Sequence, residues 1–217
     1  MSRRRLDMQA ESELATFLDD YFYSRLIDSG ALTSAQRITD IETQREGVDV
    51  IVSKNSWQAL IDEKAQLYYI NNGLPTFAFE LGFLLEGHET IGWFLNDELR
   101  TDRYFLLWPN ATTSDLKRLT AKDFTSVYGL MIKKKSVQQY LQGIGLSKEH
   151  LLKKLHQLRA SGIVGKHPSG NSGVYYYVSD PSQYSESPIN LVISKKILKN
   201  IASAAYNIKP DAFERLK

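Results

Sequence analysis

The chain has 217 residues, enough for one large domain or for a core domain with a smaller appendage. It contains no cysteine, which excludes disulfides, thiolate nucleophiles, zinc fingers and iron–sulfur clusters, and its four histidines are scattered. No apolar run approaches the roughly 20 residues of a membrane helix, and the N-terminal sequence lacks the apolar block of a signal peptide. The sequence therefore predicts a cytoplasmic protein without membrane association.

The formal net charge of +2 hides an uneven distribution along the chain. Residues 1–120 carry 12 Lys/Arg and 19 Asp/Glu, a net −7, whereas residues 121–217 carry 15 and 6, a net +9. An acidic half beside a basic half is what a metal-binding site joined to a polyanion-binding surface would produce. The alternative is a basic face that is simply solvated.

The first half of the chain predicts one helix followed by several strands. Residues 8–28 place apolar side chains at helical spacing and are followed by Gly30, which predicts an amphipathic helix. Short apolar runs bounded by turn residues predict strands. These strands cover residues 47–53, 58–65, 76–85, 89–95 and 103–108, with a turn at 54–56 and with Pro109 ending the last.

The second half mixes helices and strands. Ser147 can cap a helix that runs to about Ala160, and Gly162 ends it. The other predicted elements are a strand at 126–132, a short helix at 136–142, a hairpin at 163–178, a strand at 189–194 and a helix at 194–206. We place the division between a core domain, residues 1–134, and a basic α+β extension, residues 135–217.

Charged residues interrupt two apolar runs where a buried strand would normally avoid them. Asp49 lies in one predicted strand, and Asp62, Glu63 and Lys64 lie in the next. Alternate side chains of a strand share a face, so Asp62 and Lys64 point the same way while Glu63 points to the other side. Because Asp49 is one short hairpin away, the sequence predicts two carboxylates and an ammonium group converging at one end of a sheet.

A divalent cation would explain this arrangement, because a buried ion without a partner costs several kcal/mol. Oxygen ligands without cysteine suit Mg²⁺ or Mn²⁺. Lys64 would then stabilise the charge that develops on phosphate, or orient or deprotonate the attacking water. Two acids, one lysine and a metal are sufficient for phosphodiester hydrolysis.

The run Gly47-Val48-Asp49, followed by Asp62-Glu63-Lys64, resembles the signature of the PD-(D/E)XK nuclease superfamily. The resemblance covers about residues 8–108 and implies the restriction-endonuclease-like α/β fold, a mixed central sheet flanked by helices. It also implies that Asp49 and Asp62 bind the metal, that Lys64 assists hydrolysis, and that the main-chain carbonyl of Glu63 is a candidate further ligand.

Members of this family often carry a glutamate on the preceding helix, where this chain offers Glu11 and Glu13. At about 100° per residue, Glu11 lies about 50° from the centre of the apolar stripe and Glu13 about 110° away, which makes Glu11 the better candidate. Gln66 joins the candidate catalytic residues, as in members with a glutamine downstream of the lysine. The chain departs from the pattern at Val48, where the family often has proline.

An ordinary cross-strand ion pair on a solvated face is the alternative interpretation of these charges. In that case Lys64 would pair with one aspartate and no chemistry would follow. The apolar residues on both sides of the aspartates favour a buried site over this alternative.

The basic second half resembles a helix-turn-helix with a wing, formed by the two helices and the hairpin that follows them. The same order also suits a packing extension of an α/β domain. Tyr175 and Tyr177 share one face of their strand, where they could stack on bases or pack on a sheet. Candidate nucleic-acid-binding residues are Lys133, Lys134, Lys135, Lys153, Gln157, Lys166 and His167.

The sequence therefore predicts a metal-dependent nuclease, with Mg²⁺ or Mn²⁺ as cofactor and DNA as partner. Enzymes of this kind often act as homodimers that cut both strands, and we expect the same here by analogy. The alternatives are a winged-helix DNA-binding module and an interaction protein that keeps the nuclease fold without activity.

Overall fold

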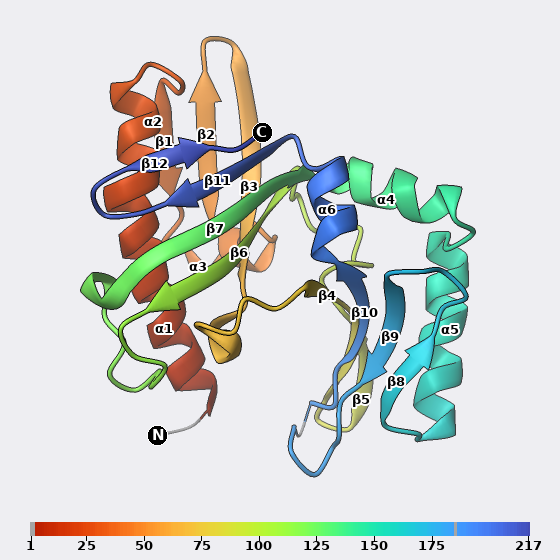
Figure 1. The fold of residues 1–217 in the computed structure, drawn as a ribbon. Coiled ribbons are helices and arrows are strands. Elements are labelled where there is room, and N and C mark those ends of the chain that lie inside the picture. The colour runs from red at the N-terminus through yellow and green to blue at the C-terminus, as the bar shows by residue number, and fades with distance from the viewer. Residues whose placement is uncertain (1–2, 185) are drawn as a thin grey trace. The chain divides into compact units, whose positions relative to one another are not determined.

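The computed structural model describes residues 3–184 and 186–217, which form two compact units interleaved along the sequence (Figure 1). The first unit comprises Met1–Leu74, Arg100–Lys134 and Ala202–Lys217, and the second comprises Pro75–Leu99 and Lys135–Ile201. The predicted division shares the boundary after Lys134. It differs at residues 75–99, which belong to the second unit and not to the predicted core, and at residues 202–217, which belong to the first unit and not to the predicted extension.

A mixed seven-stranded sheet, with the order β1-β2-β3-β6-β7-β11-β12, forms the centre of the first unit. Its strands are β1 (Ser34–Arg37), β2 (Val50–Lys54), β3 (Trp57–Ala65), β6 (Arg103–Ala111), β7 (Phe124–Lys133), β11 (Ala204–Ile208) and β12 (Phe213–Arg215). β3 and β6 run parallel, and the other neighbouring pairs are antiparallel. The connections contain the short helices α3 (Ile41–Arg45), η2 (Leu67–Tyr69) and η3 (Ala121–Asp123).

One long helical segment covers a face of this sheet (Figure 1). It consists of α1 (Arg3–Leu18), a π-helical turn η1 (Asp19–Tyr23) and α2 (Ser24–Asp28). Its apolar stripe is buried against the strands, and the ring of Phe22 stacks on that of Phe105 at 5.0 Å between centroids. The helix predicted over residues 8–28 is confirmed, because its apolar periodicity matches the face that the sheet buries.

The second unit contains a five-stranded antiparallel sheet with the order β5-β4-β10-β9-β8. Its strands are β4 (Thr76–Leu85), β5 (His88–Ile91), β8 (Gly165–Pro168), β9 (Val174–Val178) and β10 (Ile189–Ser194), and its helices are α4 (Lys134–Gly143), α5 (Lys148–Ser161) and α6 (Lys195–Ile201). The chain is thus mixed α/β, with one mixed and one antiparallel sheet and flanking helices.

α5 begins and ends as the sequence predicts. Ser147 accepts a hydrogen bond from the His150 amide at 3.3 Å, and Gly162 ends the helix with a φ of 62°. The leucines on one face of α5 are buried against the sheet, and a Cβ atom at Gly82 would lie 2.8 Å from a methyl group of Leu155. The hairpin after α5 is therefore part of a five-stranded sheet and does not stand alone as a two-stranded wing.

The predicted C-terminal helix, residues 194–206, is wrong beyond Ile201. α6 ends there, and Ala204–Ile208 form β11, which pairs antiparallel with β7. Alanine favours a helix over a strand, but pairing with a strand about 75 residues earlier in the chain overrides this local preference.

Several strand ends also differ from the prediction. β6 continues through Pro109, because β3 pairs with it only as far as Leu107 and the missing amide hydrogen therefore faces no strand. β5 ends at Ile91, β8 begins only at Gly165 after two exposed residues, and β2 begins at Val50. Asp49 thus lies just before its strand.

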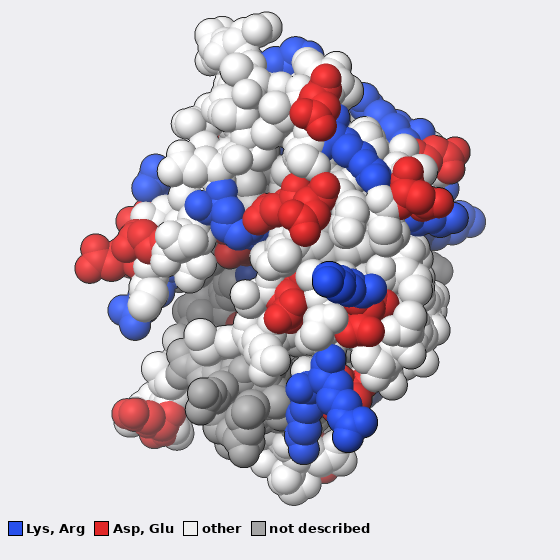
Figure 2. All heavy atoms as spheres, turned by 90° about the vertical axis from the view of Figure 1, so that its left-hand side faces the viewer, with Lys and Arg blue, Asp and Glu red and all other residues white. Residues whose placement is uncertain are grey.

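Charge is mixed on the folded chain. The first unit carries 18 Lys/Arg and 17 Asp/Glu, and the second 9 and 8, because the acidic and basic halves of the sequence are shared between the units. Figure 2 shows blue and red side chains interspersed on the face that it draws. Within the part of the chain that the structure describes, no helix is long and apolar enough to cross a membrane.

Candidate functional site

The β2–β3 hairpin brings Asp49, Asp62 and Lys64 together at one end of the first unit's sheet. Val50, the first residue of β2, pairs with Ile61, and Asp49 lies just before it, close enough for its charge and side chain to act on Asp62. The Asp49 amide donates to the Ile61 carbonyl at 2.8 Å. The Asp49 carboxylate accepts a hydrogen bond from the Glu63 amide at 2.7 Å, which fixes its orientation.

Asp62 is nearly inaccessible to solvent, with 1% of its surface exposed. Its Oδ1 atom lies 2.6 Å from Nζ of Lys64, whose side chain is 29% exposed. Its Oδ2 atom is buried and has no hydrogen-bond partner among the described residues. Since a buried carboxylate oxygen normally accepts at least one hydrogen bond, this atom needs an explanation.

The electrostatics of the cluster favour a proton on Asp62 and a positive charge on Lys64. Burial raises the pKa of Asp62 to about 7. The positive charge of Lys64 opposes this rise, whereas the negative charge of Asp49 and a hydrogen bond between the two carboxyl groups increase it. Burial alone would lower the pKa of Lys64, but the charges of Asp62, Asp49 and Glu11 raise it above its ordinary value. An ammonium group held in this way suits charge stabilisation better than proton abstraction.

Tyr104 lies beside this cluster, although the sequence gives no sign of its role. It pairs with Asp62 across the parallel β3–β6 ladder, and its ring is fully buried. Burial, with the charge of Asp62, raises the pKa of its hydroxyl group. A strand-pair partner from 42 positions later in the chain cannot be read from a local pattern.

Glu63 points to the opposite face of β3, as predicted, and its carboxylate is held there by two residues, Tyr23 and Arg37. Its carboxylate accepts hydrogen bonds from Tyr23 Oη at 2.8 Å and from Arg37 Nη1 at 2.8 Å. Arg37 also binds both carboxylate oxygens of Asp19, at 2.7 and 2.8 Å. Arg37 ends β1, a strand that the sequence does not predict, so this network cannot be anticipated from local patterns.

The main chain of Glu63 faces Asp49. The amide and carbonyl of one strand residue point to the same side, and the Glu63 amide binds the Asp49 carboxylate, so its carbonyl also points to the Asp49 side of β3. Gln66 follows the end of β3 with φ −89° and ψ 57°, so strand alternation no longer carries its side chain to the Asp62 face.

The two glutamates of the first helix differ in their surroundings. Glu11 is exposed, and its charge is among those that raise the pKa of Lys64. Glu13 accepts a hydrogen bond from the Ala121 amide at 2.8 Å, so it holds the N-terminus of η3. Of the two candidates, Glu11 is the one whose charge acts on the cluster.

The two carboxylates form a small set of protein ligands that suits Mg²⁺ or Mn²⁺. Among the described residues, no group of three or more His, Cys, Asp and Glu side chains is arranged to hold a metal ion. Mg²⁺, however, commonly takes one or two carboxylates and completes its shell with water and substrate phosphate. Asp49 and Asp62 supply those carboxylates, and the Oδ2 atom of Asp62 is buried and receives no hydrogen bond from a donor among the described residues.

The chain matches no protein-family model, and no curated protein or solved structure is significantly similar to it.

The raised pKa of Asp62 predicts a pH dependence of stability without metal. Between the ordinary pKa of 3.8 and about 7 the folded chain holds a proton that the unfolded chain releases, so stability falls as pH rises through this window. The fall contributed by Asp62 approaches about 1.4 kcal/mol per pH unit. Urea unfolding in EDTA at pH 5 and pH 8 should show a larger loss for wild type than for Asp62→Asn. Equal losses would contradict the prediction.

The candidate nucleic-acid-binding residues lie on several elements. Lys133 ends β7, Lys134 and Lys135 begin α4, Lys153 and Gln157 are exposed on α5, and Lys166 and His167 lie in β8. The His167 ring contacts the Ile163 carbonyl at 2.9 Å and is therefore engaged within its hairpin. Lys133 and Lys134 belong to the first unit and the others to the second.

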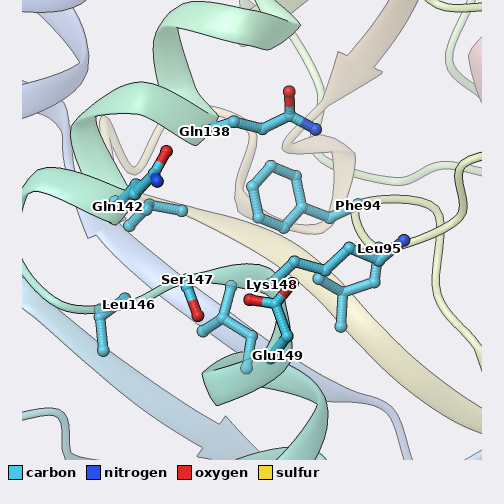
Figure 3. Close-up of a pocket in the computed structure, with 10 residues that line it drawn as sticks. Phe94, Leu95, Gln138, Gln142, Leu146, Ser147, Lys148 and Glu149 are labelled. Carbon is cyan, nitrogen blue, oxygen red and sulfur yellow. The ribbon is translucent and has the colours of Figure 1, made fainter.

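A small cavity of about 190 Å³ lies in the second unit where α4 turns into α5 (Figure 3). Phe94 and Leu95 face it from the segment after β5, and Gln138 and Gln142 face it from α4. Its volume is below the roughly 300 Å³ at which small-molecule pockets begin, and none of the residues of the carboxylate cluster lines it.

Proposed function

We propose that this chain is a metal-dependent nuclease that hydrolyses DNA phosphodiester bonds at Asp49, Asp62 and Lys64, and that its first unit has the restriction-endonuclease-like fold. The observation that carries the proposal is the Asp62 carboxylate, which is 1% exposed and has one buried oxygen without a partner among the described residues. A proton shared between Asp62 and Asp49 is the alternative partner for that oxygen, and a cation bound by both carboxylates would take its place.

Glu63, the next residue, offers an internal comparison. Both of its carboxylate oxygens accept hydrogen bonds, from Tyr23 and Arg37, so this is how a structural carboxylate is buried in β3. Asp62 lies on the same strand, is more deeply buried and has fewer hydrogen-bonding and ion-pair partners. The contrast supports a ligand for Asp62 that is not part of the chain.

Each residue has a distinct role in the proposed reaction. Asp49 and Asp62 would hold Mg²⁺ or Mn²⁺, with the Glu63 carbonyl facing the same side of β3. When bound, the metal supplies Lewis-acid activation of the scissile phosphate and of water. The Lys64 ammonium group, 2.6 Å from Asp62, stabilises the negative charge that develops on the phosphate oxygens.

DNA cleavage in the presence of Mg²⁺, Mn²⁺ or EDTA tests the proposal. Wild type should nick supercoiled and linear DNA only with metal, and Lys64→Ala should slow cleavage by about 100-fold or more because it removes the positive charge beside the phosphate. Lys54→Ala, an exposed lysine on the same hairpin, is the matched control and should cleave normally. Cleavage in EDTA, or full activity in Lys64→Ala, would refute the proposal.

A DNA-binding module is the second candidate, favoured by the order α4, turn, α5 and β8–β9 hairpin and by the exposed Lys153 and Gln157 on α5. Binding by gel shift without cleavage of either DNA, at any metal concentration, would support this candidate over the nuclease.

A further inference from the structure

The tip of the β8–β9 hairpin forms an open groove of about 420 Å³ in the second unit, which we call the hairpin groove. Residues 168–174 line it with small polar side chains and main chain, together with Thr76, Lys166, Tyr175 and Ser194. Among the described residues that line it, Lys166 is the only charged one, and none carries a carboxylate. The hydroxyl of Ser169 and the side-chain amide of Asn171 donate within the hairpin, so it is the charge of Lys166 that favours an anionic ligand.

The groove opens onto the sheet face that α5 does not cover. On the covered side, Lys154 of α5 lies over the ring of Tyr176, which is 1% exposed. Strand alternation turns Tyr175 and Tyr177 to the opposite side, and in the β8–β9 register Lys166 pairs with Tyr177. We call the surface of Lys166, Tyr175 and Tyr177 the tyrosine face.

Tyr177 and Lys166 are exposed on the tyrosine face, whereas Tyr175 is half-buried and lies beneath Lys166. Tyr177 is 44% exposed, although a tyrosine of this sheet can be buried completely, as Tyr176 is. The Lys166 ammonium group lies 4.2 Å from the Tyr175 ring centroid, and it forms no ion pair within residues 3–184 and 186–217. A cation and two aromatic rings thus lie next to a groove whose described lining residues include no acid.

We propose that the tyrosine face and the hairpin groove bind single-stranded DNA, with a phosphate near Lys166 and bases on Tyr175 and Tyr177. The inference rests on the proposed function for the identity of the ligand, and it narrows the substrate to DNA with an unpaired segment. An anion-binding groove beside aromatic rings matches a chain of phosphates and planar bases.

The spacing of the tyrosines favours a single strand over a duplex. Two residues apart on one strand, Tyr175 and Tyr177 are separated by about 6.7 Å along β9. Bases stacked in a duplex are about 3.4 Å apart and have no free face toward a protein surface. Two rings at twice that spacing can each receive a base only from a strand whose bases are unstacked.

Fluorescence anisotropy in EDTA, where cleavage is suppressed, measures this binding directly. We would titrate fluorescein-labelled dT15 and a labelled 15-base-pair duplex with wild type, Tyr177→Ala, Tyr177→Phe and Tyr184→Ala. The single strand should bind at least about 10-fold tighter than the duplex, and Tyr177→Ala should lose about 10-fold for dT15. Tyr177→Phe should keep most of the affinity because it keeps the ring, and the control Tyr184→Ala should bind as wild type.

A salt series with Lys166→Gln tests the phosphate contact. The slope of log K against log salt concentration should fall by about 0.7 if one phosphate contact is lost. Equal affinity for duplex and single strand, wild-type binding by Tyr177→Ala, or an unchanged salt slope in Lys166→Gln would each overturn the inference.

The failure of this inference can be told apart from failure of the proposed function. If dT15 binds preferentially in EDTA but no DNA is cleaved in Mg²⁺, the proposed single-strand binding is supported and the proposed nuclease activity is refuted. If the protein cleaves DNA with metal, Lys64→Ala abolishes this cleavage and single strands are not preferred, the nuclease activity is supported and the single-strand binding is refuted.

Discussion

Replacing Asp62 by asparagine is expected to reduce DNA cleavage about 1,000-fold, because the variant loses a charged metal ligand worth several kcal/mol of transition-state stabilisation. The same change should raise the free energy of unfolding at pH 8 by about 1–3 kcal/mol in EDTA. At that pH wild type carries a buried negative charge on a group whose pKa is about 7, and asparagine removes this charge while keeping the shape.

Lost activity without lost stability separates the loss of a functional carboxylate from unfolding of the variant. If Asp62 served only to pair with Lys64, its replacement would leave the ammonium group with one partner fewer, and stability would fall. Cleavage assays and urea unfolding on the same preparations measure both effects. Asp28→Asn, at an exposed position of the same unit, is the control and should change neither quantity. A destabilised Asp62→Asn would count against the proposed function.

Arg37→Ala is expected to lower the free energy of unfolding by about 3–5 kcal/mol, because it leaves Glu63 buried without its cation. The Glu63 side chain is 9% exposed, and Arg37 joins it to Asp19 on η1. The pair therefore ties β1, β3 and the helical segment together. Urea unfolding with comparison of midpoints and slopes measures the loss.

A double replacement shows how much of the lost stability comes from the buried, unpaired charge of Glu63. Arg37→Met combined with Glu63→Leu should recover most of the stability, since apolar residues of similar volume often replace a buried pair with little loss. Arg100→Ala is the matched control, because Arg100 and Glu46 form an exposed pair with side chains 57% and 45% exposed. It should cost less than about 1 kcal/mol. Similar losses in Arg37→Ala and Arg100→Ala would contradict the prediction.

Local patterns predicted the features that depend on neighbouring residues. The long first helix, the Ser147 cap and the Gly162 end of α5 all follow from spacing and capping within a few positions. The opposite faces of Asp62 and Glu63 follow from strand alternation alone. These features depend only on the few residues around them, so the sequence is sufficient to predict them.

Features that depend on contacts between distant segments were decided by the tertiary structure. Residues 204–208 are a strand because β7 pairs with them, and Arg37 has a role because β1 brings it to Glu63. The interleaving of the two units likewise distributes the charge that the linear sequence separates. The sequence alone determined which side chains of β3 share a face, but only the fold determined that Glu63 has its partners and that one oxygen of Asp62 has no donor among the described residues, because those partners come from segments far away in the chain.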